Sequence, residues 1–357
     1  MYLLGFESSC DETAAAVLSC EGHRLSILSN IVASQIETHR RFGGVVPEIA
    51  GRAHAEAISR ITYEALDAAG VSLSDIGCVA VTSHPGLIGA LLVAVNFAKS
   101  LAVSHGIPLV EVDHMKAHIA AAYLTDEPPA PPFLAMAVSG GHTSIYLVSD
   151  YTSYTEIGST RDDAIGESFD KVGRLIGIPY PAGAGFDRLA REGFQAATGL
   201  TDGFWDSYRH SAAYRDPAMH LPSPALAGDT LDFSFSGLKT AAVNLLHHAE
   251  QTGEPLDRAA FAARYTYEAV EGVAKKLDLA LSRHRTLPLV VSGGVAANSH
   301  LRARLTALTA AHGVRLCLPP LSLCGDNGAM VAAQGYYEFL SGARATSRLN
   351  ARAADEV

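Results

Sequence analysis

The feature that most constrains the fold is a pattern that occurs twice. An apolar strand, YLLGFE at 2–7, is followed by the polar turn SSCDE and a second apolar strand, TAAAVLS at 13–19. PFLAMAVS at 132–139 and SIYLVS at 144–149 repeat this order around a glycine-rich turn. A repeated unit of this kind predicts two lobes built alike, although two unrelated hairpins would give the same pattern.

Strands and helices alternate along the chain, which predicts an α/β fold. Apolar residues recur every three or four positions over 51–70 and 261–281, as in helices with one buried face. CVAVTS at 78–83 is typical of a buried strand, and residues 288–310 are typical of a strand, a glycine turn and a helix. A last helix over 326–342 is expected to pack back on the first lobe.

A chain of 357 residues is long enough for two domains, and proline marks the boundary between them. The richest proline stretch is DEPPAPPF at 126–133, and prolines at this density interrupt regular structure. We therefore expect a first lobe of residues 1–125 plus 322–345, a second lobe of residues 126–321 with helical insertions, and a tail of residues 346–357.

Apolar residues make up 48% and charged residues 18% of the chain, which is typical of a globular protein. The formal net charge of -10 argues against binding of nucleic acid through the overall field, although a local basic groove or a partner could supply one. Five scattered cysteines without a CxxC pair suit a reducing compartment. The apolar run at 87–95 is too short for a bilayer, and no basic segment precedes the first strand. These features predict a cytoplasmic protein without a membrane anchor.

His114 and His118 are four residues apart in DHMKAHIAA, so on a helix both imidazoles share one face and can reach one metal ion. With 15 histidines in the chain, chance gives roughly 0.6 such pairs, so the pair needs support from elsewhere. The zinc-peptidase motif requires Glu directly after the first His, and here that residue is Met115. A metal site is therefore favoured over a peptidase site.

A third ligand must come from another segment, and Asp326 at the head of the last helix is the best candidate. Asp113 and Glu111 are nearer in sequence, and Asp326 could instead be a helix N-cap. Two histidines and one carboxylate leave positions open on Fe²⁺ or Zn²⁺, which suits a metal that binds substrate.

Two glycine-rich turns, SGGHT at 139–143 and SGGVAAN at 292–298, each follow an apolar strand. Glycine lets backbone N–H groups approach a phosphate, and the second turn opens a helix whose N-terminus favours an anion. Neither turn matches a Walker loop or a Rossmann fingerprint. Together they predict nucleotide binding.

Three groups of charged residues could serve a site, and two of them also have a plain interpretation. Glu7, Asp11 and Glu12 in ESSCDET could serve a site or a solvated turn, and the cluster His39, Arg40 and Arg41 could contact a phosphate. Carboxylates around the Pro/Gly loop of residues 165–190 could accept ribose hydroxyls or could be helix-face charges. FSFSGLKT at 233–240 has no role that follows from its residues.

Taken together, these segments resemble the bacterial TsaD family, the tRNA N6-adenosine threonylcarbamoyltransferases once labelled O-sialoglycoprotein endopeptidases. The similarity runs in order from residue 3 to about residue 340, and the combination of motifs is specific. The segments that carry it are ESSCDET, THRRFGGVVPEIAGRAH, PGLIGALLVA, DHMKAHIAA, VSGGHT, DDAIGESFDKVGRLIGIPYP, FSFSGLKT, SGGVAANSHLR and CGDNGAM.

The resemblance implies an actin/Hsp70/sugar-kinase-like (ASKHA) fold, with two related lobes and a nucleotide and metal site in the cleft. It implies transfer of the threonylcarbamoyl group from threonylcarbamoyl-AMP to N6 of adenosine 37 in tRNAs that read ANN codons. One divalent metal is implied, with Fe²⁺ favoured and Zn²⁺ as the second candidate. The implied partners are the tRNA anticodon loop, a TsaB-like paralogue and a TsaE-like ATPase.

The site residues that the resemblance implies fall into two sets. The metal ligands are His114, His118 and Asp326. The contacts to the donor nucleotide are Val138, Ser139, Gly140, Gly141, His142, Asp170, Gly183, Asp187 and Asn298.

The sequence departs from the family pattern at a few positions. His84 stands where Gly usually precedes Pro-Gly-Leu, Gly325 replaces Thr or Ser, and Ala182 and Ala184 alter the loop around Gly183. The proposed ligands are intact, but these alanines put the contact at Gly183 in doubt.

The proton on the attacking N6 needs a base, and Asp11 is the expected one. Two other functions compete with this interpretation: a metallopeptidase and an ASKHA-type ATPase. A requirement for tRNA separates them from the transferase.

Overall fold

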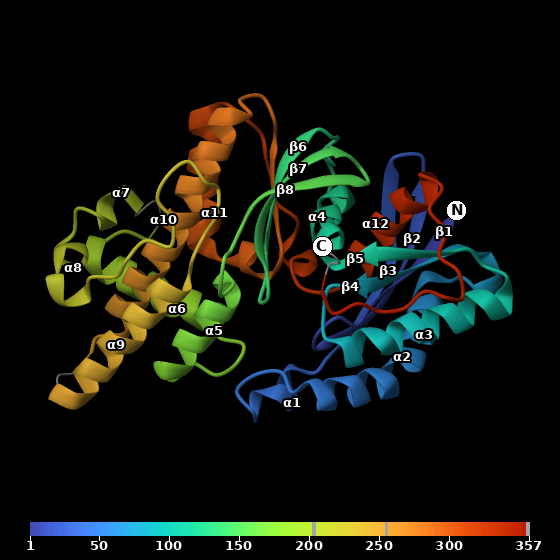
Figure 1. Cartoon of the computed structure of the whole chain (residues 1–357), viewed down its shortest axis with the longest axis horizontal. Helices are drawn as coiled ribbons and strands as arrows, with labels where there is room; N and C mark the ends of the chain where they lie inside the picture. Colours follow the sequence, from blue (N-terminus) through green and yellow to red (C-terminus); the bar gives the residue numbers. More distant parts are fainter. Residues whose placement is uncertain (202–204, 254–255, 355–357) are drawn as a thin grey trace. The chain divides into compact units, whose positions relative to one another are not determined.

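The computed structural model describes residues 1–201, 205–253 and 256–354, and its contacts divide the chain into two compact units (Figure 1). Unit 1 comprises Met1–Phe133, Val148–Thr155 and Cys317–Val357, and unit 2 comprises Leu134–Leu147 and Glu156–Leu316.

The units differ from the expected lobes at their edges. The segment Val148–Thr155 belongs to unit 1, where the ring of Tyr151 stacks on that of Tyr337 with centroids 4.0 Å apart. The expected tail of residues 346–357 is also part of unit 1, and its last residues, 355–357, lie outside the described part of the chain.

Unit 1 is built on a five-stranded mixed sheet of order β3-β2-β1-β4-β5. β1 pairs antiparallel with β2 and parallel with β4, and β4 pairs parallel with β5. The first predicted hairpin is thus confirmed, and β3 extends it by a strand that the sequence pattern did not predict. The strands are β1 Tyr2–Glu7, β2 Glu12–Glu21, β3 Arg24–Ser34, β4 Ile76–His84 and β5 Leu109–Asp113.

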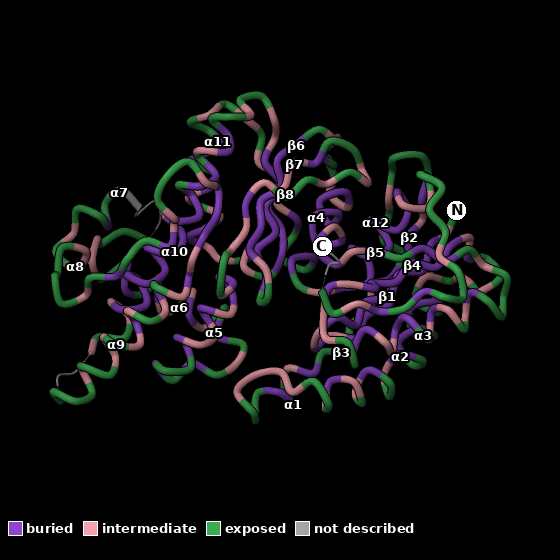
Figure 2. Tube along the Cα trace, viewed as in Figure 1, coloured by how far each residue is buried: buried purple, intermediate pink, exposed green. Residues whose placement is uncertain are grey.

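Different helices cover the two faces of this sheet, because neighbouring residues of a strand point to opposite sides. Leu4 and Phe6 of β1 belong to the apolar core that α2 (Pro47–Ala69) and α3 (Ile88–His105) complete. Gly5 points the other way, towards α12 (Gly328–Leu340), where an added Cβ would lie 2.5 Å from the carbonyl oxygen of Gly328. The last helix therefore packs on the first sheet as expected, and the buried strands between the helices can be followed in Figure 2.

The second sheet repeats the first. Its order is β10-β9-β6-β7-β8, so both sheets place their own strands in the order third, second, first, fourth and fifth. β6 pairs parallel with β9, as β1 does with β4. Two unrelated hairpins would not share a whole sheet order, so the expected pair of related lobes is confirmed. The strands are β6 Phe133–Val138, β7 Thr143–Asp150, β8 Ser153–Ser159, β9 Leu289–Ser292 and β10 Leu316–Cys317.

Short helices and insertions complete the two units. In unit 1, α1 (Ile36–Arg40) precedes α2, and α4 (His114–Ala120) follows β5 directly. In unit 2 the described helices lie between β8 and β10 in the sequence, before and after β9 (Figure 1). These helices are α5 Ile165–Leu175, α6 Gly183–Thr198, α7 Trp205–Tyr208, α8 Ala212–Arg215, α9 Ser236–Thr252, α10 Arg258–Arg283 and α11 Ser299–His312.

By length and composition α3 could cross a membrane, since it has 18 residues with a mean hydropathy of 1.4. Core helices pass the same test, and Leu91, Ala94 and Ala98 of α3 are buried in the apolar core of unit 1. Among the described residues no other helix passes it.

Candidate functional site

The two histidines at the start of α4 lie on one helix face, as their spacing predicted. β5 runs directly into this helix, and Asp113 caps it: its Oδ1 accepts hydrogen bonds from the backbone N–H of Met115 at 2.6 Å and of Lys116 at 3.1 Å. The rings of His114 and His118 meet with centroids 4.5 Å apart. The cap fixes where the helix begins and hence where both rings point.

Asp326 reaches these histidines from a distant part of the sequence. Its Oδ1 lies 3.2 Å from Nε2 of His118 and 3.7 Å from Nε2 of His114. The N-cap of α12 is the next residue, Asn327, whose side chain accepts a hydrogen bond from the N–H of Met330 at 3.0 Å. The capping alternative for Asp326 is therefore wrong, and the carboxylate faces the histidines instead.

These three side chains have the chemistry of a metal site. Their nitrogen and oxygen ligand atoms all lie within 4.8 Å of one another, and no other group of His, Cys, Asp and Glu does so in the described ranges. His118 is 1% exposed; its Nδ1 has no hydrogen-bond partner among the described residues, and its Nε2 faces the Asp326 carboxylate at 3.2 Å without a hydrogen bond. A buried imidazole without such partners is costly unless a ligand satisfies it. The donor set fits a single divalent metal.

Glu7 orients the first histidine, and the sequence did not identify this role. Its Oε2 lies 3.0 Å from Nδ1 of His114 and accepts a hydrogen bond from the hydroxyl of Thr82 at 2.6 Å, while Oε1 accepts one from the N–H of Ser9. Burial raises the pKa of Glu7, but the charge and hydrogen bond of His114 outweigh it and hold the pKa below its usual value. A carboxylate behind a ligating histidine fixes the ring and its tautomer.

The interpretation of ESSCDET as a solvated turn is wrong for Glu7, which is fully buried at the end of the central strand β1. A signal was present in the sequence. A carboxylate that ends an apolar central strand has no route to solvent, so it needs a buried partner.

The rest of the acidic turn lies beside the proposed metal ligands. Burial and the charges of Asp326 and Asp11 raise the pKa of Glu12 to about 10, and burial and the same two carboxylates raise the pKa of Cys10 well above its usual value. Asp11 itself is 7% exposed. His54 anchors the turn through a contact of 3.0 Å between its Nε2 and the carbonyl oxygen of Cys10. Asp11 and Asp326 thus both raise the pKa of Glu12 and of Cys10 in this turn.

In the cluster His39, Arg40 and Arg41, the imidazole of His39 is buried and is not available to contact a phosphate. His39 is fully buried, with Nε2 3.0 Å from Oε1 of Gln35 and Nδ1 accepting a hydrogen bond from the N–H of Val46 at 3.3 Å. Arg40 forms an ion pair with Glu37 at 2.8 Å. His39 thus stabilises the turn between α1 and α2.

In unit 2 the two glycine-rich turns follow the parallel strands β6 and β9. In the first turn the N–H of Ser139 donates to the carbonyl oxygen of His142 at 2.9 Å, and the N–H of His142 donates to the Ser139 hydroxyl at 3.2 Å. An added Cβ at Gly140, Gly141 or Gly294 would meet no atom within 4 Å. The backbone at these three glycines is exposed and thus open to an approaching ligand.

Two of the residues predicted to contact the donor nucleotide, Asp170 and Asp187, also tie neighbouring helices together. Asp170 Oδ1 accepts the N–H of Ala182 at 2.7 Å, and Asp187 Oδ1 accepts the N–H and hydroxyl of Ser299 at 3.1 and 2.9 Å. Asn298 caps α11. These bonds link the helices α5, α6 and α11, so the side chains are held in place before any ligand binds.

Close backbone packing brings these helices to the turns. An added Cβ at Gly166 of α5 would lie 2.5 Å from the carbonyl oxygen of Ser139, and one at Gly293 would lie 2.4 Å from that of Val138. All the residues predicted to contact the donor nucleotide therefore lie in unit 2, around adjoining turns: Val138, Ser139, Gly140, Gly141, His142, Asp170, Gly183, Asp187 and Asn298.

We expect Gly293→Ala to lower the free energy of unfolding by at least about 2 kcal/mol, because the residue has φ of +94° and no space for a Cβ. Gly294→Ala is the matched control, since a Cβ there meets open space. Urea unfolding of both variants measures the difference. Equal midpoints would show that the contact with Val138 is not required.

FSFSGLKT, for which the sequence suggested no role, anchors the segment before α5. The carboxylate of Asp162 accepts the N–H groups of Phe235 and Ser236 at 2.8 and 3.1 Å, and Lys239 forms an ion pair with Asp163. Although burial raises the pKa of Asp162, the serine hydroxyls and these N–H groups lower it more. The motif thus fixes the approach to the N-terminus of α5.

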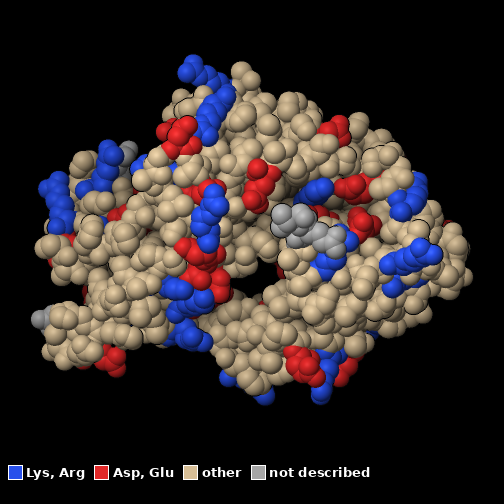
Figure 3. Space-filling view, viewed as in Figure 1, with Lys and Arg blue, Asp and Glu red and all other residues tan. Residues whose placement is uncertain are grey.

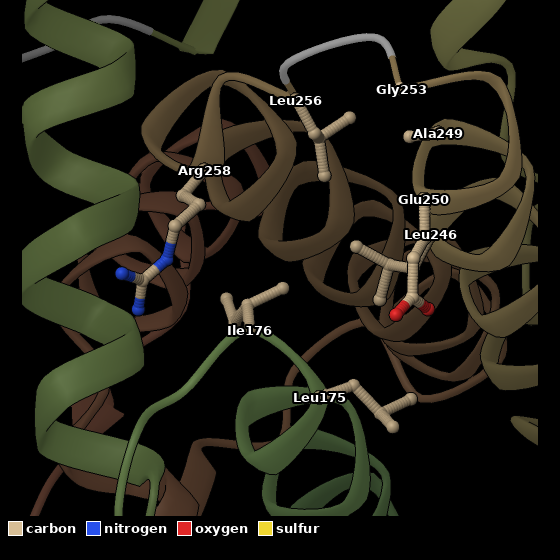
Figure 4. A pocket seen from close by; sticks show the side chains of 8 residues that line it. All are labelled: Leu175, Ile176, Leu246, Ala249, Glu250, Gly253, Leu256 and Arg258. Carbon is tan, nitrogen blue, oxygen red and sulfur yellow. The ribbon is translucent and has the colours of Figure 1, made fainter.

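A separate hollow in unit 2, of about 430 Å³, lies between α5, α9 and the start of α10 (Figure 4). Leu175, Leu246 and Leu256 line the hollow, and the charged side chains of Glu250 and Arg258 lie at its sides. None of the predicted site residues lines it.

Charge is mixed on the face seen in Figure 3, where lysine and arginine side chains are scattered among acidic ones. This distribution agrees with the net charge of -10 and gives no broad basic surface on that face.

Known proteins resemble the chain over almost its whole length. The model of the TsaD family, described as tRNA N6-adenosine threonylcarbamoyltransferase, matches residues 26–333. The enzyme of that name from Geobacillus thermodenitrificans (strain NG80-2) is 47% identical over 352 residues, which cover 98% of this chain and 95% of the relative. The one from Moorella thermoacetica (strain ATCC 39073 / JCM 9320) is 45% identical over 349 residues, with coverage of 98% and 95%.

Solved structures resemble the chain in fold. Full-length HypF in its phosphate- and nucleotide-bound form matches with a TM-score of 0.55 and 16% identity, covering 94% of this chain and 45% of HypF. HypF of T. kodakarensis matches with a TM-score of 0.53 and 12% identity, covering 98% and 48%. The chain thus spans about half the length of HypF, and at such identities the likeness shows the fold alone. The predicted ASKHA fold is confirmed.

Proposed function

Because the chain belongs to the TsaD family of tRNA N6-adenosine threonylcarbamoyltransferases, we propose roles for its residues in forming N6-threonylcarbamoyladenosine in tRNA. The enzyme is an acyltransferase. We assign to it threonylcarbamoyl-AMP as donor and N6 of adenosine 37 in tRNAs that read ANN codons as acceptor. The observation that carries this assignment is the convergence of His114, His118 and Asp326 in a chain of this family.

His114, His118 and Asp326 would hold one divalent metal, with Fe²⁺ favoured and Zn²⁺ as the second candidate. Such a metal would supply Lewis acidity that orients and polarises the carbamoyl group of the donor. Glu7 keeps the proton of His114 on Nδ1 and thereby directs Nε2 towards the metal position.

We assign the nucleotide end of the donor to the turns and helices of unit 2. The open backbone of the turn from Val138 to His142 would face the AMP phosphate, where N–H groups stabilise the charge that develops as AMP leaves. Asp170, Gly183, Asp187 and Asn298 would contact the nucleoside. The open space at Gly183 supports its assignment despite the neighbouring alanines.

The transfer itself forms a bond between N6 of adenine and the carbamoyl carbon, and it breaks the bond from that carbon to the oxygen of AMP. N6 loses a proton in this step, and we assign Asp11 as the base that accepts it. An exocyclic amine is a weak nucleophile, so correct positioning of the anticodon-loop adenine carries much of the rate.

Further parts of the assignment concern partners and location. A chain with a net charge of -10 has little general attraction for tRNA, so we propose that a TsaB-like paralogue and a TsaE-like ATPase complete the complex. Co-purification of these two partners with the tagged chain tests the proposed complex. We place the enzyme in the cytoplasm, where tRNA is modified.

The function is tested by transfer of labelled threonine from threonylcarbamoyl-AMP to unmodified ANN-decoding tRNA, with the partner proteins present and the product nucleosides resolved by mass. We expect labelled N6-threonylcarbamoyladenosine only when tRNA is present. Peptide cleavage or ATP turnover without tRNA, together with no labelled nucleoside, would favour the peptidase or the ATPase instead. In single-turnover assays, Asp11→Ala should slow transfer about a hundredfold or more, and an unchanged rate would remove Asp11 from the mechanism.

A further inference from the structure

The C-terminal segment after α12 returns to the strands that lead into the proposed metal site. Ala345 donates its N–H to the carbonyl oxygen of Leu109 in β5 at 2.7 Å. Leu349 and Ala351 are buried in the apolar core of unit 1, and Lys99 of α3 donates to the carbonyl oxygen of Leu349 at 2.8 Å. The C-terminal segment is thus packed into unit 1 as an ordered part of its fold.

Its end places Arg352 against the carboxyl end of β4. The N–H of Arg352 donates to the carbonyl oxygen of Ser83 at 2.9 Å. Its Nη2 lies 2.8 Å from Nδ1 of His84 and 3.3 Å from Nε2, and 3.4 Å from Oε2 of Glu111. Nδ1 of His84 also lies 2.6 Å from the hydroxyl of Ser83, so Arg352 and Ser83 together hold the imidazole on this side.

The other ring nitrogen of His84, Nε2, lies within ion-pair range of Asp113, the residue that caps α4. Nε2 of His84 lies 3.7 Å from Oδ2 of Asp113, and the side chains of both are 16% exposed. The other oxygen of Asp113 accepts the N–H groups at the start of α4, whose first residue is His114. Arg352 therefore reaches the metal-binding helix through His84 and Asp113.

We propose that His84 and Arg352 are positioning residues for the metal site: Arg352 holds the ring of His84, and His84 holds the carboxylate that caps the helix of His114 and His118. This inference rests on the proposed metal function. His84 is also a position at which the chain departs from the family pattern, so the arrangement gives this departure a physical role.

The test is a titration with Co²⁺, followed by the visible absorption of the bound ion, on the full-length protein. We expect His84→Ala and Arg352→Ala each to weaken Co²⁺ binding up to about tenfold, because supporting partners of metal ligands act on affinity to this degree. The double variant should bind no more weakly than the weaker single one, since the two residues act in series. Arg352→Lys keeps a donor for Nδ1 and should restore part of the affinity.

Arg348→Ala, at an exposed arginine of the same segment, is the matched control. The melting temperature of each metal-free variant shows whether the segment stays folded, because a merely structural role would lower it without changing the Co²⁺ affinity of the folded protein. Equal affinities of the Arg352→Ala and Arg348→Ala variants would overturn this inference alone. Absence of Co²⁺ binding by the wild type would overturn the metal site as well.

Discussion

Replacing His118 by alanine is expected to lower threonylcarbamoyl transfer by about a thousandfold or more. His118 supplies one of the three groups that converge in unit 1, and with it removed only His114 and Asp326 remain to hold the ion. Loss of a metal that polarises the reacting group removes several kcal/mol of transition-state stabilisation, and about 4 kcal/mol corresponds to this factor.

The measurement is single-turnover transfer to tRNA together with the metal content of the purified protein. Both should fall together, because the ring of His118 makes no hydrogen bond among the described residues and its Nε2 faces only another proposed ligand, Asp326, at 3.2 Å. His105→Ala, on the exposed C-terminal turn of α3, is the control and should retain metal and activity. Full activity of His118→Ala with no bound metal would refute the metal assignment.

Glu7→Gln should weaken metal binding about 10- to 100-fold, with a matching loss of transfer, while the volume of the side chain is kept. The carboxylate lies 3.0 Å from Nδ1 of His114 and is fully buried, so its charge is felt without screening by solvent. A glutamine amide cannot supply that charge, and it can present a donor to a nitrogen that also donates.

Competition with a chromophoric chelator measures the affinity of each variant for Zn²⁺. Glu64→Gln is the control, since Glu64 is a half-exposed partner of Arg60 on the surface of α2, where a charge contributes little. If Glu7→Gln bound Zn²⁺ as tightly as this control, the hydrogen bond to His114 would not tune the site.

Local patterns in the sequence predicted the elements well. The two hairpins, the helices α2 and α10 and the strand β4 followed from periodicity, because burial of a face repeats every two residues in a strand and every three or four in a helix. The shared face of His114 and His118 is of the same kind, since four residues along a helix return to the same side.

The functional site could not be predicted fully from local patterns, because it is formed by contacts between residues far apart in the sequence. From the sequence, Asp326 could be either a metal ligand or the N-cap of the last helix. The structure shows that Asn327 is the N-cap and that Asp326 faces His118. Glu7 looked like part of a polar turn because its partner His114 lies 107 residues away in the sequence.

The sequence by itself predicted most of the central strands and long helices, although not β3, showed a hairpin pattern that occurs twice, and indicated which side chains could bind a metal. The tertiary structure decided which of these side chains meet. Gly5 lets α12 pack against β1, and this close approach brings the segment before α12, with Asp326, to the start of α4. Periodicity is a property of neighbouring residues, whereas convergence depends on how sheets and helices pack, and the free energy that selects this packing comes from burial summed over the whole core.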